Sequence, residues 1–291
     1  MAGVDRADAA AQRLASAVNL PLDEIEVHHF PDRESRIRAL SSAETVLVYC
    51  SLNDPNAKLI ELALAAAAYR DLQAKRLVLV APYLCYMRQD AAFRVGEAVS
   101  QRVIARFLAQ HFDRIVTIAP HLHRTTSLSE IFPDTECTSL AVTSLLEGLL
   151  KGDAGGDDAI AVGPDFESRN WVEPLAANAG IPWMTLQKTR KCDDEVVLEK
   201  SNLAAAAGRR VYLVDDVLST GQSLAQASRL LLSGGAASVE ALVVHALCSE
   251  GDLARLRRAG IHRVRSTDTV PHSTNAVSVA ALLAAALRSE C

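Results

Sequence analysis

Short β-branched runs alternate with longer helical patterns along almost the whole chain, and this alternation restricts the fold more than any other feature. A strand, a crossover helix and a second strand together build a parallel sheet covered by helices on both faces. Aromatic residues make up only 4% of a sequence rich in Ala, Leu and Val, which suits helices packed on a buried parallel sheet. We therefore predict an α/β fold with two doubly wound parallel sheets. The expected strands are 45–49, 76–81, 114–119, 159–163, 182–187, 210–215, 239–246 and 263–266.

The ends of the intervening helices can be read from the residues that flank them. Asp54 followed by Pro55 predicts an N-cap with proline at the first helical position. Gly234 and Gly235 predict a left-handed turn that ends a helix at residue 233. The stretch LLKGDAGGDDAIAVGPD resembles a loop and opens a second series of strands, so we predict two domains, 1–138 and 139–291. The expected helices begin at 55 or cover 98–111, 222–233 and 276–288.

Charge and cysteine usage argue against several classes of protein. The formal net charge of the 291 residues is −5, and acidic and basic residues are interleaved, so the sequence does not indicate a nucleic-acid-binding surface. The six cysteines form no CxxC pair, which favours reduced thiols over a zinc ribbon or a disulfide framework. The amino terminus carries charges where a signal peptide needs an apolar run, and no apolar stretch could span a bilayer. We expect a cytoplasmic protein without nucleic-acid or membrane partners.

The segment VYLVDDVLSTGQS, residues 211–223, has the most specific chemistry in the chain. A buried strand ends in Asp215 and Asp216, and a short loop then leads into a helix. Ligands of open α/β sheets bind in the crevice beyond the carboxyl ends of the strands. The loop amides can face a phosphate at the helix amino terminus, with Thr220 and Ser223 as further donors. Because carboxylates repel phosphate, the two aspartates suit sugar hydroxyls or a hydrated magnesium ion. The pattern predicts a sugar-phosphate site, the alternative being a strand end and an ordinary turn.

This segment resembles the phosphoribosyl diphosphate-binding motif of the type I phosphoribosyltransferase fold. That motif alone does not separate transferases, which consume phosphoribosyl diphosphate, from synthetases, which make it. Four further segments resemble the ribose-phosphate diphosphokinases, also called phosphoribosyl pyrophosphate synthetases, in the order that this family shows. The resemblance implies that the ribose 5-phosphate site consists of Asp215, Asp216, Ser219, Thr220, Gly221, Gln222 and Ser223.

Two of the four segments correspond to the family's ATP site. FPDRES, residues 30–35, resembles a loop that reaches a neighbouring subunit's site and holds adenine; Phe30 would stack on the base, and Asp32 and Glu34 would accept its hydrogen bonds. YLCYMRQDAAF resembles a stretch beside the ATP phosphates. There Arg88 offers a guanidinium fork suited to phosphate oxygens, with Gln89 and Asp90 beside it. Each segment alone is also compatible with an ordinary solvated turn.

The other two segments correspond to the family's metal and pyrophosphate contacts. In TIAPHLHRTTS, His123 stands where the family places a magnesium-binding histidine near the phosphates, whereas His121 replaces a common aspartate. In VGPDFESRNW, Asp165 matches a residue that helps hold the metal and pyrophosphate. The loop that follows departs from the small residues of many members, and we expect Ser168 and Arg169 to supply side-chain donors instead.

Lys188 and Arg190 in LQKTRKCDDEV match the Lys-x-Arg of the family's mobile catalytic loop. Two departures accompany this match. Many synthetases have an acidic residue at the position of Ser219. We expect the resemblance to run from about residue 27 to the carboxyl terminus, with the residues before it lacking the apolar strand that opens the fold. The resemblance implies catalysis by Lys188, Arg190 and His123, with magnesium held by His123 and Asp165.

The implied activity is transfer of diphosphate from Mg-ATP to the 1-hydroxyl of ribose 5-phosphate, giving phosphoribosyl diphosphate and AMP. The implied partners are ATP, ribose 5-phosphate and further copies of the chain, in a homodimer or higher homo-oligomer with shared active sites. Two alternatives stay open: a phosphoribosyltransferase, and a non-catalytic regulatory homologue that keeps the fold.

Overall fold

The computed structural model describes residues 1–3, 9–41, 43–153, 158–186, 188–192, 195–198 and 203–291, and gives only the backbone for 152–153, 188–192 and 195–198. The chain forms two compact units. Unit 1 contains Met1–Ala141, Thr269–Pro271 and Ser278–Cys291, and unit 2 contains Val142–Asp268 and His272–Val277. The domain boundary near residue 138 stays a prediction. The units are not continuous in sequence, because the carboxyl-terminal residues belong to unit 1.

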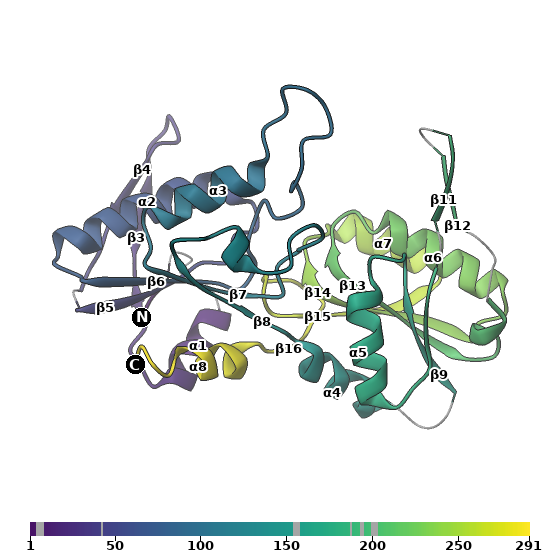
Figure 1. Cartoon of the computed structure of the whole chain (residues 1–291). Helices are drawn as coiled ribbons and strands as arrows, with labels where there is room; N and C mark the ends of the chain where they lie inside the picture. Colours follow the sequence, from purple (N-terminus) through teal and green to yellow (C-terminus); the bar gives the residue numbers. More distant parts are fainter. Residues whose placement is uncertain (4–8, 42, 154–157, 187, 193–194, 199–202) are drawn as a thin grey trace. The chain divides into compact units, whose positions relative to one another are not determined.

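Unit 1 is built on a parallel sheet of six strands with helices on both faces (Figure 1). Its helices are α1 (Ala9–Val18), α2 (Pro55–Asp71), α3 (Ser100–Ala109) and α8 (Ala280–Leu287). Helices α2 and α3 cover one face, and α1 and α8 pack together on the other. The sheet has the order β2-β1-β5-β6-β7-β8. The strands are β1 (Ala2–Gly3), β2 (Asp23–Glu24), β5 (Thr45–Tyr49), β6 (Arg76–Ala81), β7 (Arg114–Ile118) and β8 (Glu136–Leu140).

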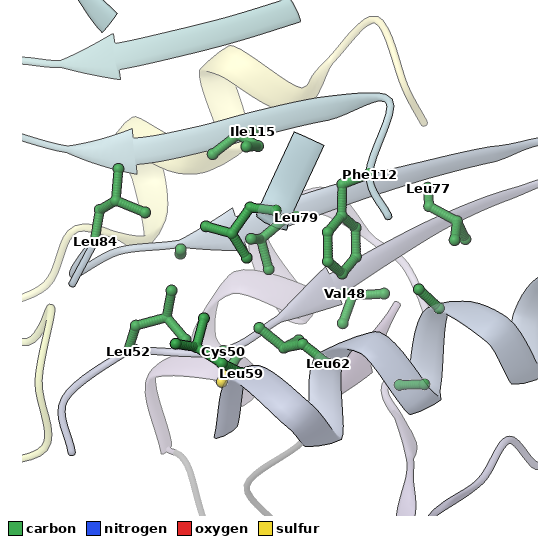
Figure 2. Close-up of a cluster of buried hydrophobic side chains, with 14 of the residues drawn as sticks. Val48, Cys50, Leu52, Leu59, Leu62, Leu77, Leu79, Leu84, Phe112 and Ile115 are labelled. Atoms are coloured by element: carbon green, nitrogen blue, oxygen red, sulfur yellow. The ribbon is translucent and has the colours of Figure 1, made fainter. Parts of the chain in front are cut away.

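The core of unit 1 lies between α2 and the sheet. Figure 2 shows Leu59 and Leu62 of α2 facing Val48 and Leu79 of the central strands. Helix α2 is rich in Ala and Leu, and its core-facing side buries Leu62, Ala65 and Tyr69 almost completely. One charged residue, Glu61, is buried on the same helix at 6% exposure. A short antiparallel hairpin, β3 (Glu26–His29) and β4 (Ser35–Arg38), packs beside α2.

Unit 2 repeats the architecture of unit 1. Its six parallel strands have the order β10-β9-β13-β14-β15-β16, which in chain order is the same 2-1-3-4-5-6 arrangement as in unit 1. Helices α4 (Thr143–Asp153) and α5 (Arg169–Ala179) contact each other, as do α6 (Gln222–Ser233) and α7 (Glu250–Arg258). The strands are β9 (Ala159–Gly163), β10 (Trp183–Thr185), β13 (Arg210–Leu218), β14 (Ser238–Ala246), β15 (Ile261–Thr267) and β16 (Asn275–Val277).

The predicted fold class is confirmed, and every expected strand lies within two residues of an observed one except at the carboxyl end of β13. That strand was expected to end at Asp215 but continues to Leu218, because its pairing with β14 runs on to Leu218 opposite Ala246. The helix expected at 276–288 begins only at Ala280, since residues 275–277 join the sheet as β16. The helix expected at 222–233 is α6. Gly235, with φ of +93°, makes the predicted left-handed turn.

Asp54 is the N-cap of α2 and Pro55 is its first residue, as predicted, although the Asp54 backbone is left-handed, with φ of 48°, and its side chain makes no capping hydrogen bond. One prediction about local structure is wrong. The amino terminus does contain a strand, since Ala2 and Gly3 pair with Val48 and Tyr49 of β5. A strand of two residues is too short to show a β pattern in sequence.

The described part of the chain contains no helix with both the length and the apolar character that a membrane crossing needs. The five cysteines whose side chains are described are free thiols: Cys50, Cys85, Cys137, Cys248 and Cys291.

Candidate active site

The strongest candidate site in unit 2 lies where β9 and β13 end side by side. These neighbouring strands are the point at which the strand order reverses, and ligands of doubly wound sheets bind there. Asp215 and Asp216 lie inside the extended β13, and Asp165 follows β9. The extension of β13 therefore leaves a loop of only three residues, 219–221, between the strand and α6.

The acidic groups at this point are close enough to affect one another. Burial, then the charges of Asp216 and Asp165, raise the pKa of Asp215 well above its usual value. Asp216 is 7% exposed. Each aspartate accepts from the next backbone amide, Asp215 Oδ1 from Asp216 N at 3.0 Å and Asp216 Oδ1 from Val217 N at 2.8 Å. Such a desolvated acidic group suits hydrogen-bond donors or a cation, because either would offset the repulsion.

The short loop 219–221 is shaped by Gly221. Its φ is +72°, which an L side chain rarely adopts, and an added Cβ would lie 3.0 Å from Leu256 Cδ2. Helix α6 begins at the next residue, Gln222, so the loop and the first turn of α6 present backbone amides at a helix amino terminus. Thr220 and Gln222 are exposed, and Ser219 and Ser223 are partly buried. The loop can therefore receive an anion from solvent.

Helix α7 contacts this loop through Arg255. Arg255 donates from Nη2 to the backbone oxygen of Thr220 at 3.4 Å and also bonds Asp252. Asp252 belongs to a capping box with Ser249 at the start of α7. The sequence analysis did not single out Arg255.

The loop after β9 is held by its own side chains. Ser168 is 4% exposed; its Oγ donates to Asp165 O at 2.5 Å, and its backbone amide donates to Asp165 Oδ1 at 3.1 Å. Arg169 pairs with Glu173 at 3.0 Å and lies over the Trp183 ring. Gly163 allows the close approach, since an added Cβ would lie 2.3 Å from Ser168 Oγ. Ser168 and Arg169 therefore have local partners, and their expected role as phosphate donors stays a prediction.

Lys188 and Arg190 lie on β11 (Lys188–Cys192), which pairs antiparallel with β12 (Glu195–Leu198). Their side chains are outside the described part of the structure. The backbone nevertheless places both residues on one arm of a hairpin, two positions apart.

In unit 1, Phe30, Asp32 and Glu34 form the turn between β3 and β4. The turn is closed by Phe30 N to Glu34 O at 2.8 Å and by Arg33 N to Phe30 O at 2.9 Å. Asp32 Oδ1 accepts from Glu34 N at 3.1 Å. The Phe30 ring is 40% exposed and meets the His28 ring edge-on at 4.8 Å. An apolar ring thus stands at a hairpin tip with two exposed carboxylates beside it.

Arg88, Gln89 and Asp90 follow β6. Arg88 is exposed. The Gln89 side chain is already engaged, since its Oε1 accepts from Ser100 N at the start of α3. The Asp90 side chain is 4% exposed and pairs with Arg124 at 2.5 Å, and the Arg124 guanidinium lies 5.4 Å from the centre of the Phe93 ring.

The Asp90–Arg124 pair joins the segments that follow β6 and β7, and so brings a predicted ATP-site segment together with the segment of the predicted metal-binding histidine. His123, next to Arg124, is exposed, and its ring centre lies 3.9 Å from that of His121. Arg124 was missed in the sequence although it directly follows His123 in the segment TIAPHLHRTTS. A lone arginine in a loop gives no signal until its partner is known.

Within the described residues, no group of three or more His, Cys, Asp and Glu side chains is arranged to hold a metal ion. His123 belongs to unit 1 and Asp165 to unit 2, so neither unit by itself contains the predicted metal pair.

Comparison with known proteins agrees with this organisation. Residues 2–111 match the family model of the N-terminal domain of ribose phosphate pyrophosphokinase, and residues 134–281 match that of the phosphoribosyl transferase domain. The chain is 31% identical over 280 residues to a ribose-phosphate pyrophosphokinase of Methanopyrus kandleri, covering 96% of this chain and 94% of that protein. It is 34% identical over 281 residues to the enzyme of that name from Methanosarcina mazei, with 95% and 91% covered.

A solved structure supports the same conclusion. The phosphoribosylpyrophosphate synthetase of Mycobacterium smegmatis superposes with a TM-score of 0.85 at 27% identity, and the match covers 100% of this chain and 98% of that one. The family model matches from residue 2, which also corrects the view that the resemblance begins near residue 27. The resemblance inferred from the motifs is confirmed, and the chain belongs to the ribose-phosphate pyrophosphokinase family.

Proposed function

We propose that this protein makes phosphoribosyl diphosphate by transferring diphosphate from ATP to the 1-hydroxyl of ribose 5-phosphate, with release of AMP. One observation carries the proposal. At the strand-order reversal of unit 2, a three-residue loop at the amino terminus of α6 stands beside Asp215 and Asp216. An anion-binding turn next to two carboxylates fits a sugar phosphate better than it fits a nucleobase.

Ribose 5-phosphate would use the two halves of this site differently. The loop amides at 219–221 and the Thr220 and Ser223 hydroxyls would donate to the 5-phosphate. Asp215 and Asp216 would accept hydrogen bonds from the ribose hydroxyls, and these donors would offset the burial and the repulsion that together raise the pKa of Asp215. Gln222 and Ser219 would border the phosphate.

The nucleotide would be held by the residues of unit 1. The exposed Phe30 ring offers a stacking surface for adenine, with Asp32 and Glu34 as acceptors. Arg88 would contact phosphate oxygens, with Gln89 and Asp90 shaping the loop through Ser100 and Arg124. Because the family loop that FPDRES resembles reaches a neighbouring subunit, the proposal includes a dimer or higher oligomer with shared active sites.

The donor chemistry of these residues suits magnesium in part. Magnesium prefers oxygen ligands, keeps several waters and is bound through one or two carboxylates plus substrate phosphates. Asp165 supplies a carboxylate beside the ribose site, and a cation there fits the acidic group described above. His123 would be a less usual ligand. Magnesium, when bound, would neutralise charge on the triphosphate.

The reaction needs alignment more than a protein nucleophile. The bond between the 1-oxygen of the sugar and the β-phosphorus forms while the bond from that phosphorus to AMP breaks. The loop at 219–221 would fix one end of the sugar and so aim its 1-hydroxyl. Lys188, Arg190 and Arg88 would stabilise the charge that develops on the departing AMP. We place this chemistry in the cytoplasm, in keeping with the free thiols.

A product assay tests the proposal. The protein is incubated with Mg-ATP and ribose 5-phosphate, and AMP and phosphoribosyl diphosphate are measured together. We expect the two products in equal amounts. Consumption of added phosphoribosyl diphosphate with a purine base would instead identify a transferase. If neither reaction takes place, the protein is a non-catalytic homologue.

A further inference from the structure

The base of the hairpin β3–β4 is held by one buried carboxylate. His29 and Ser35 are directly opposite each other across the two strands and are the last such pair before the turn. Both donate to the same atom, Glu61 Oε1 on α2, from His29 Nε2 at 2.7 Å and from Ser35 Oγ at 3.0 Å. A single side chain therefore joins both strands just below the turn that carries Phe30.

Glu61 stands where an apolar residue would be expected. It lies four residues before the fully buried Ala65 and eight before Tyr69, so it shares their face of α2, and it is only 6% exposed. A buried carboxylate is costly unless hydrogen bonds compensate it. Both described donors come from the hairpin. The two hydrogen bonds from the hairpin therefore offset the cost of burying Glu61, and they form only when the hairpin is ordered against α2.

An apolar contact attaches the hairpin to unit 1 at a position further from the turn. Val27 and Ile37 form another directly opposite pair and pack against the core of unit 1. The apolar pair attaches the hairpin to the core, while the carboxylate fixes the end nearest the turn. Without Glu61, the hairpin keeps its attachment but loses the contact closest to Phe30.

We propose that Glu61 is a positioning residue for nucleotide binding: acting through His29 and Ser35, it sets the direction in which the turn at 30–34 presents Phe30. This inference rests on the proposed function, in which that turn holds adenine. Its role differs from a purely structural one, because loss of Glu61 then weakens the binding of ATP selectively. Ribose 5-phosphate, bound in unit 2, is unaffected.

The test compares Glu61→Ala and Glu61→Gln with Asp71→Asn, an exposed carboxylate near the end of the same helix. Because Glu61→Ala removes both hydrogen bonds that hold the hairpin end nearest Phe30, we expect it to raise the Michaelis constant for ATP about tenfold, which corresponds to about 1.4 kcal/mol. The Michaelis constant for ribose 5-phosphate and the turnover should stay within about twofold by the same reasoning. Glu61→Gln keeps one oxygen acceptor and should fall between Glu61→Ala and the wild type. Asp71→Asn should match the wild type.

Amide hydrogen exchange over residues 26–38 provides a readout that needs no activity. Glu61→Ala should speed exchange in the hairpin while the core strands β5 and β6 stay protected. Unchanged exchange, an unchanged Michaelis constant for ATP, or equal increases for both substrates would each overturn the proposal. If the wild type makes no phosphoribosyl diphosphate, the proposed function fails, and the exchange experiment still decides whether Glu61 orders the hairpin.

Discussion

The two units share one strand order but differ at the corresponding strand ends. In unit 2, β13 is followed by a short loop, and Thr220 of this loop and Gln222 at the start of α6 are exposed. In unit 1, the corresponding strand is β5, and the polar groups of the segment that follows it already bond to other residues of unit 1. Ser51 Oγ donates to Thr269 O at 2.6 Å, and Lys58 Nζ donates to Ser51 O at 2.8 Å and to Asn53 at 3.1 Å.

This difference shows that the same strand order can leave the corresponding strand end open to a ligand or filled by side chains, depending on the residues that follow the strand. The candidate site of unit 2 lies where the strand order reverses. The candidate residues of unit 1 lie elsewhere, on the hairpin β3–β4 and after β6 and β7, where side-chain pairs such as Asp90–Arg124 hold them. A small ligand with a phosphate suits the first arrangement, and a long nucleotide spread over several loops suits the second.

The largest expected effect is on the stability of unit 1, and it concerns the amino ends of its strands, opposite to the carboxyl ends where the candidate residues lie. Glu290 pairs with Arg76 and Arg114 at the amino ends of β6 and β7, each at 2.8 Å, and Glu290 and Arg114 are nearly buried. Hydrogen bonds from Arg76, then from Arg114, lower the pKa of Glu290 from 4.5 to about 2. That shift corresponds to about 3 kcal/mol, so Glu290→Gln should lower the free energy of unfolding by about this amount at pH 7, as measured by urea denaturation.

The pH dependence follows from the direction of the shift. The stabilisation by Glu290 is fully present above about pH 4.5 and is lost as the pH falls towards 2. The variant should therefore show a flatter loss of stability over this range than the wild type. Glu44→Gln, which removes an exposed pair with Lys75, should leave the free energy of unfolding nearly unchanged, because solvent screens such a pair. Equal effects of the two substitutions would contradict the assignment.

The second prediction separates chemistry from binding. Lys188→Ala should lower turnover at least ~100-fold, because a lost cation no longer stabilises the departing charge, while the fold stays intact. Steady-state kinetics and circular dichroism measure the two quantities. Lys151→Ala, on the exposed side of α4, is the control and should keep normal turnover. Near-normal turnover of the Lys188 variant would remove this residue from the mechanism.

The third prediction tests whether the two units bind different substrates. Phe30→Ala should raise the Michaelis constant for ATP about tenfold, since stacking of a base on an aromatic ring contributes about 1–3 kcal/mol. The constant for ribose 5-phosphate should not change. Leu72→Ala, at 43% exposure against 40% for Phe30, controls for loss of an exposed apolar side chain. Similar increases for both substrates would count against an adenine platform.

The smallest effect tests the loop of unit 2. Gly221→Ala should raise the Michaelis constant for ribose 5-phosphate about fivefold, because the left-handed backbone disfavours a side chain by about 1 kcal/mol and the loop must shift from Leu256. Gly208→Ala is the matched control: its φ is +74° and an added Cβ meets no atom within 4 Å. Both variants should lose similar stability. Only the first should change substrate binding, and equal kinetics would contradict a role for the loop.

The sequence predicted those parts of the fold that depend on local pattern. The β-branched strands, helix α6 and the turn at Gly235 follow from runs of residues and were found as expected. The two-residue β1 and the polar β8 have no such pattern, and the extension of β13 depends on its partner β14. Asp54 carries the expected residue type, but its left-handed backbone leaves no capping bond.

The candidate site divides in the same way. The aspartates and the loop after β13 were found because they are contiguous in sequence, and their electrostatic coupling to Asp165 required the fold. The pairs Asp90–Arg124 and Glu61–His29 join residues more than thirty positions apart. No single sequence predicts which distant side chains meet, although a charged residue on the apolar face of α2 was a signal that Glu61 has a buried partner.

The most direct test of the account is a crystal structure of the protein with ribose 5-phosphate bound. We expect the 5-phosphate against the amides of residues 219–223 and the ribose hydroxyls within hydrogen-bonding distance of Asp215 and Asp216. A sugar phosphate bound elsewhere, with this loop free of any anion, would contradict it.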